Sequence, residues 1–300
     1  MKYRPLGRTG LSVSAVSFGT VSLGVDYGIA APGEFGRPGA GDAIALLKDA
    51  VARGITLFDT APAYGDSEAL IGRAIGRDMR AIIATKTAST DVETSLDGSR
   101  RALGRDTLDI VQIHNATAAV IEDTRMLDAL DAARLRGTLR FIGASVYGED
   151  AALAAIRSGR VDVLQIAFNV LDQRMASRVL PEAAAAGVGV LVRSALLKGA
   201  LTPKAQWLSD ALEPLRAQAL RARDVLAGGR WDALPAAAMR FCFSAPGVAS
   251  VLAGVRTAEE LDAALAAEAA GPLDEALMAE ARDLAIEDER LLNPSYWPVP

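Results

Sequence analysis

The stretch "TLDIVQIHNAT", residues 107–117, is an apolar run that ends at His114, the only histidine among 300 residues. Strands that are apolar on both faces must be covered on both faces, which is typical of parallel sheets flanked by helices. Seven other short apolar runs share this character, and alanine-rich segments with helical periodicity lie between them. The eight predicted strands are "AVSFGTV" (15–21), "TLFDTA" (56–61), "AIIATK" (81–86), "LDIVQIH" (108–114), "RFIGAS" (140–145), "VLQIAFN" (163–169), "GVLVRS" (189–194) and "SVLAGV" (250–255).

Eight strands joined by helical crossovers predict an α/β protein, specifically a closed (β/α)8 or TIM barrel. The alternative is an open doubly wound sheet. An open sheet that binds a dinucleotide should carry a G-x-G-x-x-G turn after its first strand, and "SFGTVSLG" (17–24) lacks that turn. We therefore expect a single barrel domain over residues 1–300.

The connections between these strands are predicted from capping and loop signals. The first long helix should begin at Asp42, which can cap it, and end at Gly54. Residues 24–41 are rich in Gly and Pro and should form a long loop at the substrate side of the barrel, and residues 195–249 hold more than one helix. The tail "DERLLNPSYWPVP" (288–300) either folds back over the barrel mouth or frays.

Composition excludes several classes of partner. The chain is 51% apolar and 23% charged with a net charge of -5, and its charges are interspersed, so we expect neither nucleic acid nor a membrane as a partner. The single cysteine, Cys242, can form neither an internal disulfide nor a multi-cysteine metal site, and no metal is expected. The N-terminal segment lacks the apolar core of a signal peptide, which predicts a cytoplasmic protein.

Four proton-handling side chains lie at or just beyond the carboxyl ends of three neighbouring predicted strands. Taken alone, each has an ordinary structural explanation: a turn cap, a packed aromatic, a solvated lysine or a hydrogen-bonded histidine. Active sites of (β/α)8 barrels gather at this end of the strands, however, and the four together predict one reaction centre. They are Asp59, Tyr64, Lys86 and His114.

These residue types suit the interconversion of a carbonyl and an alcohol. A phenol with a free pKa near ~10 is a weak acid at neutral pH. We expect the Lys86 ammonium to lower the pKa of Tyr64, and Asp59 to orient that ammonium. His114 would then position the substrate oxygen beside the Tyr64 hydroxyl.

At this point the sequence resembles the aldo-keto reductase superfamily, and the resemblance covers essentially the whole chain. It is carried by "FDTAPAYGDSEALIG" (58–72), by the strand ends "ATK" and "LDIVQIH", and by "YRPLGRTGLSVSAVSFGT" (3–20) and "SVLAGVRTAEELDAAL" (250–265). The resemblance implies an N-terminal β-hairpin that closes the barrel bottom and extra C-terminal helices. Within the superfamily the chain is most similar to bacterial members and to the branch of aldose and L-galactose dehydrogenases.

The resemblance also implies an NAD(P)(H) cofactor bound across the barrel mouth, with Tyr64 as the proton donor or acceptor. The substrate would be a small carbonyl compound or a sugar. Positions matching the family's nicotinamide, carboxamide and pyrophosphate contacts are Gly19, Thr20, Asp59, Ser145, Gln165, Arg193, Ser194, Ala195, Leu196, Lys198 and Gly199. Positions matching the contacts to the adenosine end are Gly254, Val255, Arg256, Thr257 and Glu260.

The sequence departs from the family pattern at three places. Val146 follows Ser145 where many members have asparagine, and Arg193 replaces an aromatic residue that stacks on the nicotinamide. Some NADPH-dependent members hold the 2′-phosphate with a lysine and an arginine where this chain has Gly254 and Glu260. Glu260 would repel that phosphate and Arg256 would attract it, so NAD and NADP both stay open.

Two other functions also stay open at this stage. A barrel lyase would use Lys86 to form a Schiff base with its substrate. A nucleotide-sensing subunit would keep the four residues and bind the cofactor without turnover. Neither the substrate nor the oligomeric state follows from the sequence.

Overall fold

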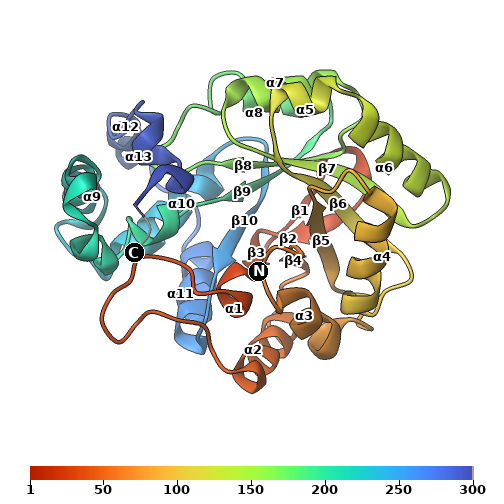
Figure 1. The fold of residues 1–300 in the computed structure, drawn as a ribbon. Coiled ribbons are helices and arrows are strands. Elements are labelled where there is room, and N and C mark those ends of the chain that lie inside the picture. Colours follow the sequence, from red (N-terminus) through yellow and green to blue (C-terminus); the bar gives the residue numbers. More distant parts are fainter. Residues whose placement is uncertain (299–300) are drawn as a thin grey trace.

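The computed structural model describes residues 1–298. At its centre lies a closed barrel of parallel strands in the order β10-β3-β4-β5-β6-β7-β8-β9 (Figure 1). All eight predicted strands are present, so the (β/α)8 barrel is confirmed and the open sheet is excluded. The strands are β3 (Val16–Gly19), β4 (Leu57–Asp59), β5 (Ile82–Thr87), β6 (Leu108–Ala116), β7 (Leu139–Val146), β8 (Val163–Ala167), β9 (Gly189–Arg193) and β10 (Val248–Gly254).

Helices surround the barrel and cover the outer faces of its strands (Figure 1). Those between β3 and β9 are α1 (Val21–Gly24), α2 (Ala40–Ala52), α3 (Ser67–Ile75), α4 (Val92–Leu103), α5 (Ala118–Glu122), α6 (Arg125–Leu135), α7 (Glu149–Arg157) and α8 (Val179–Ala185). After β9 come α9 (Glu213–Ala227), α10 (Leu234–Ser244), α11 (Ala258–Ala269), α12 (Glu275–Arg282) and α13 (Glu289–Leu292). The expectation of more than one helix between the last two strands is thus confirmed by α9 and α10, as are the extra C-terminal helices.

One predicted boundary was wrong. Helix α2 begins at Ala40 with Gly39 as its N-cap, so Asp42 lies inside the first turn. From that position its negative charge interacts favourably with the positive end of the helix dipole, but its side chain does not cap the helix. Gly54 follows the helix with φ of 91°, the left-handed conformation expected of a glycine at this place.

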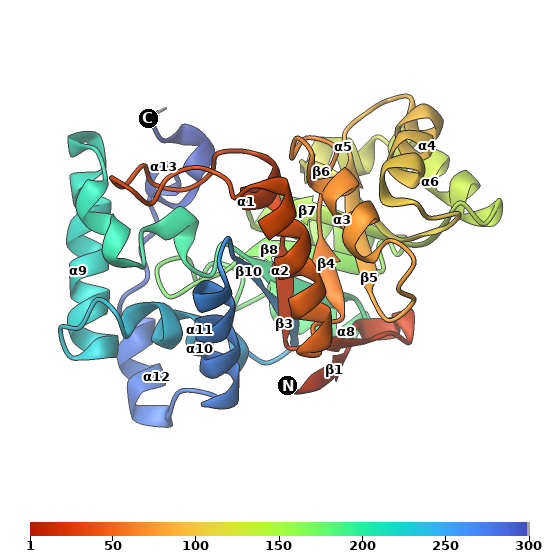
Figure 2. The same cartoon turned by 90° about the horizontal axis from the view of Figure 1, so that it is seen from below.

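The amino-terminal hairpin closes the bottom of the barrel, as the resemblance implied. Strands β1 (Tyr3–Pro5) and β2 (Ser12–Ser14) pair antiparallel, and they lie at the end of the barrel opposite the C-terminus (Figure 2). The side chains of Leu6 and Val13 are fully buried against the inward-facing residues of the barrel strands. Gly7 sits at φ of 50°, and a Cβ there would lie 2.3 Å from the backbone nitrogen of Gly189, so only glycine fits this approach.

The hairpin acts as a plug at the bottom of the barrel. Shortening one of its buried side chains should therefore destabilise the whole barrel. We expect Leu6→Ala to lower the free energy of unfolding by about 2–5 kcal/mol, because it leaves a cavity among buried strand residues. Urea unfolding of both proteins measures the difference. Leu135→Ala, at a side chain that is 89% exposed, is the matched control and should change nothing measurable. Equal losses in the two variants would contradict the role of the hairpin as a plug.

The opposite end of the barrel is partly covered by chain segments that are distant in sequence. The loop between α1 and α2 and the C-terminal segment both lie at this end (Figure 2). The tail folds back: Trp297 is only 8% exposed, and its indole nitrogen donates to the Leu291 carbonyl at 3.1 Å. The Lys198 ammonium lies 5.7 Å from the ring centroids of both Tyr27 and Trp297, which brings the loop and the tail together.

Within residues 1–298, no helix combines the length and the apolar character that crossing a bilayer requires.

Candidate active site

A buried ion pair lies at the base of the barrel mouth, which is the end of the barrel opposite the amino-terminal hairpin. Asp59 ends β4, and parallel pairing sets it opposite Ala84 of the neighbouring strand β5, two residues before Lys86. The Lys86 ammonium donates to both carboxylate oxygens of Asp59, at 2.6 and 2.7 Å, and to the Thr60 carbonyl at 2.9 Å. Burial lowers the pKa of Lys86, and the charge of Asp59 opposes that fall. Because all three N–H groups are engaged, Lys86 is poorly placed to act as a Schiff-base amine.

A chain of amides holds the Asp59 carboxylate from its other side. Gln165 and Gln112 donate to the same oxygen of Asp59 at 2.7 and 3.1 Å, and Ser145 donates to the Gln165 carbonyl oxygen at 3.1 Å. Ser145 and Gln165, expected to bind a carboxamide, therefore support the ion pair in this structure. Sequence reasoning missed Gln112. The signal was its position two residues before His114, which puts both side chains on the same face of β6.

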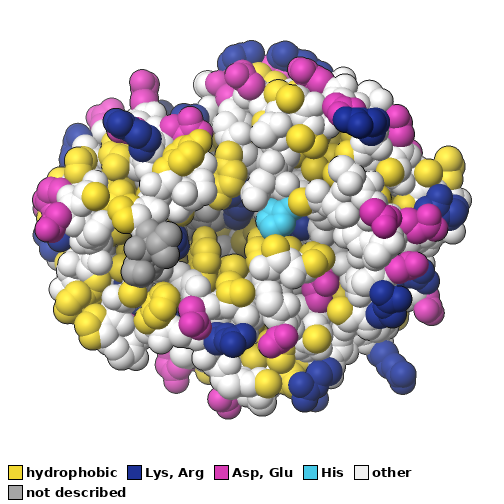
Figure 3. Space-filling view, viewed as in Figure 1, with side chains coloured by type: hydrophobic (Ala, Val, Ile, Leu, Met, Phe, Trp, Pro, Cys, Tyr) yellow, Lys and Arg dark blue, Asp and Glu magenta, His cyan; other side chains and the backbone are white. Residues whose placement is uncertain are grey.

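Tyr64 and His114 form the exposed part of the same cluster. Their rings meet edge to face, with centroids 5.7 Å apart and an interplanar angle of 86°. The Lys86 nitrogen lies 4.9 Å from the centroid of the Tyr64 ring. The only histidine of the chain is visible beside a hollow at the centre of this face (Figure 3). The four residues predicted from strand ends are thus brought together at one point.

The backbone of the turn that carries Tyr64 packs closely against the end of α1. A Cβ on Gly24, at the end of α1, would lie 1.7 Å from the Tyr64 carbonyl oxygen. The same Tyr64 carbonyl accepts a hydrogen bond from the Ser67 amide at 3.2 Å, where α3 begins. The phenol therefore projects from a rigid base, which is what a proton donor at a fixed distance requires.

The expected lowering of the Tyr64 pKa was wrong for this structure. Burial of the phenol raises its pKa above the usual value, and the negative charge of Asp59 raises it further. Burial is the larger cause, and the Lys86 ammonium, which is bonded to both carboxylate oxygens of Asp59, does not offset it. Tyr64 consequently carries its proton at neutral pH, and in this structure it is a weaker acid than a free phenol.

His114 is held neutral at physiological pH. Burial lowers its pKa to about 4, and the positive charge of Lys86 adds to the effect. A neutral imidazole can both donate and accept a hydrogen bond, which suits a residue that directs a substrate oxygen.

This lowered pKa predicts a specific pH dependence of stability. In the unfolded chain a histidine titrates near ~6.5, so as the pH falls from there toward 4 the unfolded state takes up its proton first. Stability should be independent of His114 above that window and should fall within it. Urea unfolding at pH 7.5 and pH 5 measures the loss, which we expect to be smaller in His114→Gln. An identical loss in both proteins would refute the assignment.

The residues expected around the nicotinamide lie at the ends of β3 and β9. Thr20, after Gly19 at the end of β3, donates from its amide and its hydroxyl to the Asp59 carbonyl at 3.0 and 2.9 Å. After β9 the chain is held in unusual conformations, with φ of 59° at Ser194 and 56° at Lys198. Buried Ala195, half-buried Leu196 and Gly199 complete this segment, which lies at the mouth rather than on the outer face of the barrel.

Arg193 has a defined position at the end of β9. Its guanidinium carbon lies 3.8 Å from the centroid of the Tyr147 ring, and its nitrogens donate to the Val146 carbonyl at 2.9 Å and the Ser194 hydroxyl at 3.2 Å. Val146, which replaces the family's asparagine, thus takes part through its backbone. The arginine stacks on a tyrosine of its own chain and retains its charge at the mouth.

At the position expected for the adenosine end, Arg256 and Glu260 bind each other. The guanidinium of Arg256 lies 3.1 Å from the Glu260 carboxylate, whose other oxygen accepts from the Arg256 amide at 2.7 Å. Arg256 also donates to the Glu34 carbonyl at 2.6 Å, in the loop before α2. Helix α11 begins just beyond Gly254 and Val255, where Thr257 caps it by accepting from the Glu260 amide at 3.2 Å.

The donor set at the mouth fits an anionic dinucleotide. Among residues 1–298, neither Arg193 nor Lys198 has a carboxylate within ion-pair distance, although the chain as a whole is acidic. Two cations without carboxylate partners, polar amides and a helix N-terminus are the groups that bind phosphates and an amide ring. In the same residues no cluster of three or more His, Cys, Asp or Glu side chains is arranged to hold a metal ion.

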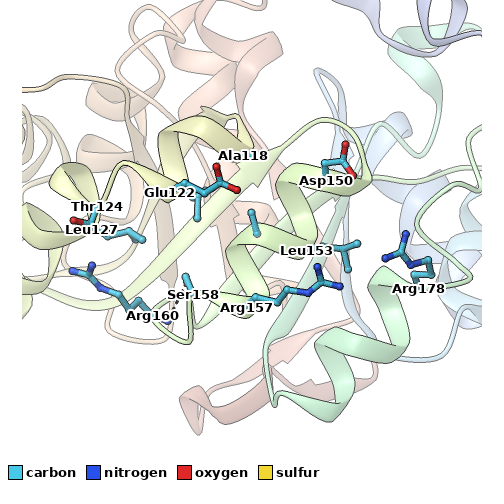
Figure 4. Close-up of a pocket in the computed structure, with 12 residues that line it drawn as sticks. Ala118, Glu122, Thr124, Leu127, Asp150, Leu153, Arg157, Ser158, Arg160 and Arg178 are labelled. Atoms are coloured by element: carbon cyan, nitrogen blue, oxygen red, sulfur yellow. Dashed lines mark hydrogen bonds between the residues drawn. The ribbon is translucent and has the colours of Figure 1, made fainter.

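A second hollow lies on the outside of the barrel, among α5, α7 and α8 (Figure 4). Its arginines are already paired: Arg157 with Glu182, Arg178 with Glu149, and Arg160 with Asp128 and Asp131. No group there is poised for proton transfer, which leaves the barrel mouth as the candidate active site.

The barrel, its hairpin and the cluster of Asp59, Tyr64, Lys86 and His114 at the strand ends define the class of a (β/α)8-barrel oxidoreductase. A model of the aldo/keto reductase family matches residues 15–286, and the chain belongs to that family. L-galactose dehydrogenase of Arabidopsis thaliana is 28% identical over 291 residues, which cover 89% of this chain and 88% of that protein.

Two further comparisons agree with this placement. NADH-specific methylglyoxal reductase of Escherichia coli strain K12 is 27% identical over 234 residues, covering 67% of this chain and 69% of that protein. The solved structure of an aldo-keto reductase from Bacillus halodurans, in its holo form, has the same fold with a TM-score of 0.80. It is 24% identical and covers 97% of this chain and 99% of that one.

Proposed function

We propose that this protein is an NAD(P)(H)-dependent enzyme that interconverts a small carbonyl compound, an aldehyde, ketone or aldose, and its alcohol or lactone. The supporting observation is the meeting of Tyr64 and His114 above the buried pair of Asp59 and Lys86. A cluster able to donate one proton to an oxygen, placed at the mouth of a barrel, suits hydride chemistry. The family membership of the chain supports the same reaction.

The bound nicotinamide would supply the hydride in carbonyl reduction and accept it in alcohol oxidation. Tyr64 donates its phenolic proton to the substrate oxygen in reduction and takes one back in oxidation. His114 holds that oxygen by a hydrogen bond from its neutral ring, and Lys86 with Asp59 fixes the electrostatic surroundings of the phenol. Because burial raises the pKa of Tyr64, oxidation should become faster as the pH rises and the phenol loses its proton more readily.

The direct test is a spectrophotometric screen of the purified protein. Each reduced cofactor is mixed with a panel of aldehydes and ketones, and each oxidised cofactor with a panel of aldoses, and absorbance of the reduced nicotinamide is followed. We expect turnover with members of at least one panel. Cofactor binding without turnover on any of them, together with a stable protein partner in pull-downs, would favour the nucleotide-sensing function instead.

For the substrate we propose a sugar or a sugar-like aldehyde. A relative whose match covers 89% of this chain is named L-galactose dehydrogenase, and its 28% identity supports this class for the present protein. The prediction is that aldoses are oxidised with higher kcat/KM than simple aliphatic alcohols. The reverse order would remove the sugar from the proposal and leave the carbonyl chemistry intact.

For the cofactor we propose a preference for NAD(H) over NADP(H). Arg256, the residue able to attract a 2′-phosphate, is neutralised by Glu260 and tied to the Glu34 carbonyl. A phosphate would have to displace that carboxylate and remain beside its negative charge. We expect NADH to bind about tenfold or more tightly than NADPH, and Glu260→Gln to reduce the difference. Fluorescence titrations with both nucleotides measure this, and tighter binding of NADPH to the unaltered protein would refute it.

A further inference from the structure

We infer that Arg193 acts as a fixed positive charge that makes the protein hold the reduced nicotinamide more tightly than the oxidised one. This inference rests on the proposed function, because it requires a nicotinamide at the barrel mouth. It concerns a property that the proton-transfer cluster does not provide, namely the relative affinity for the two redox forms of the cofactor.

The position of the guanidinium is fixed by three contacts. One face lies against the Tyr147 ring at 3.8 Å from its centroid, and two nitrogens donate to the Val146 carbonyl and the Ser194 hydroxyl. The backbone that carries the side chain is itself part of the barrel, since Arg193 is the last residue of β9. A charge held in this way does not swing out to solvent when a ligand arrives.

The charge of Arg193 also differs from those of Lys86 and Arg256, because among residues 1–298 no carboxylate is paired with it. Lys86 is paired with Asp59, and Arg256 is paired with Glu260. Arg193 has no carboxylate within ion-pair distance among the described part of the chain, residues 1–298.

The charge of Arg193 acts on Tyr64 and His114 in the reaction centre. Burial raises the pKa of Tyr64, and the Arg193 charge opposes that rise; burial lowers the pKa of His114, and the Arg193 charge adds to that fall. Arg193 therefore lies close enough to influence groups on β6 and on the loop after β4. A nicotinamide ring that exchanges hydride with a substrate held by Tyr64 and His114 would be exposed to the same positive charge of Arg193.

The effect on the cofactor follows from its change of charge. The oxidised nicotinamide ring carries one positive charge, and the ring becomes neutral when it gains a hydride. A nearby guanidinium therefore repels the oxidised form only. The bound equilibrium is shifted toward the reduced form, which favours removal of hydride from an alcohol or an aldose.

The test compares the affinities of NAD+ and NADH in three proteins. Arg193→Met removes the charge and keeps a side chain of similar length, and Arg193→Lys keeps the charge without the flat guanidinium. NADH is titrated by fluorescence and NAD+ by calorimetry, with circular dichroism and thermal unfolding to show that each variant is folded. The measured quantity is the ratio of the dissociation constant of NAD+ to that of NADH.

We expect Arg193→Met to lower this ratio about tenfold, equivalent to roughly 1.4 kcal/mol, and Arg193→Lys to leave it within about threefold of the original. An unchanged ratio in Arg193→Met overturns the inference and leaves the proposed function standing. An equal fall in both variants also overturns it, because the stacked plane rather than the charge would then be responsible. Failure of the unaltered protein to bind any nicotinamide cofactor would instead refute the proposed function, and the inference with it.

Discussion

Replacement of Tyr64 by phenylalanine should lower kcat by roughly 10²–10⁴-fold, the contribution that a positioned acid or base makes to proton transfer. The variant loses only the hydroxyl, so the ring keeps its edge-to-face contact with His114 and its place above Lys86. Affinity for NADH should stay within about twofold, because a phenol that acts in the transition state contributes little to ground-state binding. Steady-state kinetics and NADH fluorescence titration give the two quantities.

Tyr147→Phe is the matched control for this experiment. It also removes one phenolic hydroxyl near the mouth, but it keeps the ring on which Arg193 stacks, and Tyr147 is not the proposed proton donor. Its kcat should therefore be nearly unchanged. If Tyr64→Phe retained most of its activity, or if both variants lost activity equally, the assignment of Tyr64 as the acid would be wrong.

The second large effect is expected at the buried ion pair. Lys86→Met leaves the Asp59 carboxylate with two amide donors and no counter-charge, while both residues are almost completely buried. Removing one partner of such a pair is expected to lower the free energy of unfolding by about 3–5 kcal/mol. The variant should also lose activity, because the phenol of Tyr64 would then face an uncompensated negative charge. Urea unfolding and steady-state turnover are the measurements.

The double variant Asp59→Asn/Lys86→Met separates the two consequences. Asparagine keeps an oxygen that accepts hydrogen bonds from Gln112 and Gln165 but removes the charge, so much of the lost stability should return while activity does not. A surface pair offers the contrast: Arg230→Met, which breaks a fully exposed contact with Asp232, should leave unfolding unchanged. If the double variant were as unstable as the single one, the unpaired charge would not be the cause.

The barrel was predictable because its strands are apolar on both faces and short. The run that ends at His114 is buried from Leu108 to Ile113, so neither a helix nor a half-exposed strand would satisfy it. The same parallel geometry made the convergence of Asp59 and Lys86 predictable. The carboxyl ends of neighbouring parallel strands lie at the same edge of the barrel, and Lys86 is two residues beyond the partner of Asp59.

What the sequence did not predict depends on side-chain contacts between distant segments. Gln112 sits inside an apolar run, and only its burial beside Asp59 reveals why an amide is present there. The burial of Tyr64 and the nearby charge of Asp59, which reverse the expected change in the Tyr64 pKa, depend on distances that no spacing encodes. The same is true of the stacking of Arg193 on Tyr147 and of the return of the tail.

The amino-terminal plug and the reaction centre lie at opposite ends of the strands, and this separation has a consequence for how such a chain can change. Leu6 and Val13 secure the barrel from below, whereas the loop before α2 and the C-terminal segment form the upper rim. Insertions and substitutions in the rim can therefore accumulate without loosening the base. A barrel built in this way can acquire a new substrate through changes in its loops, while the reaction centre and the hairpin-closed base stay the same.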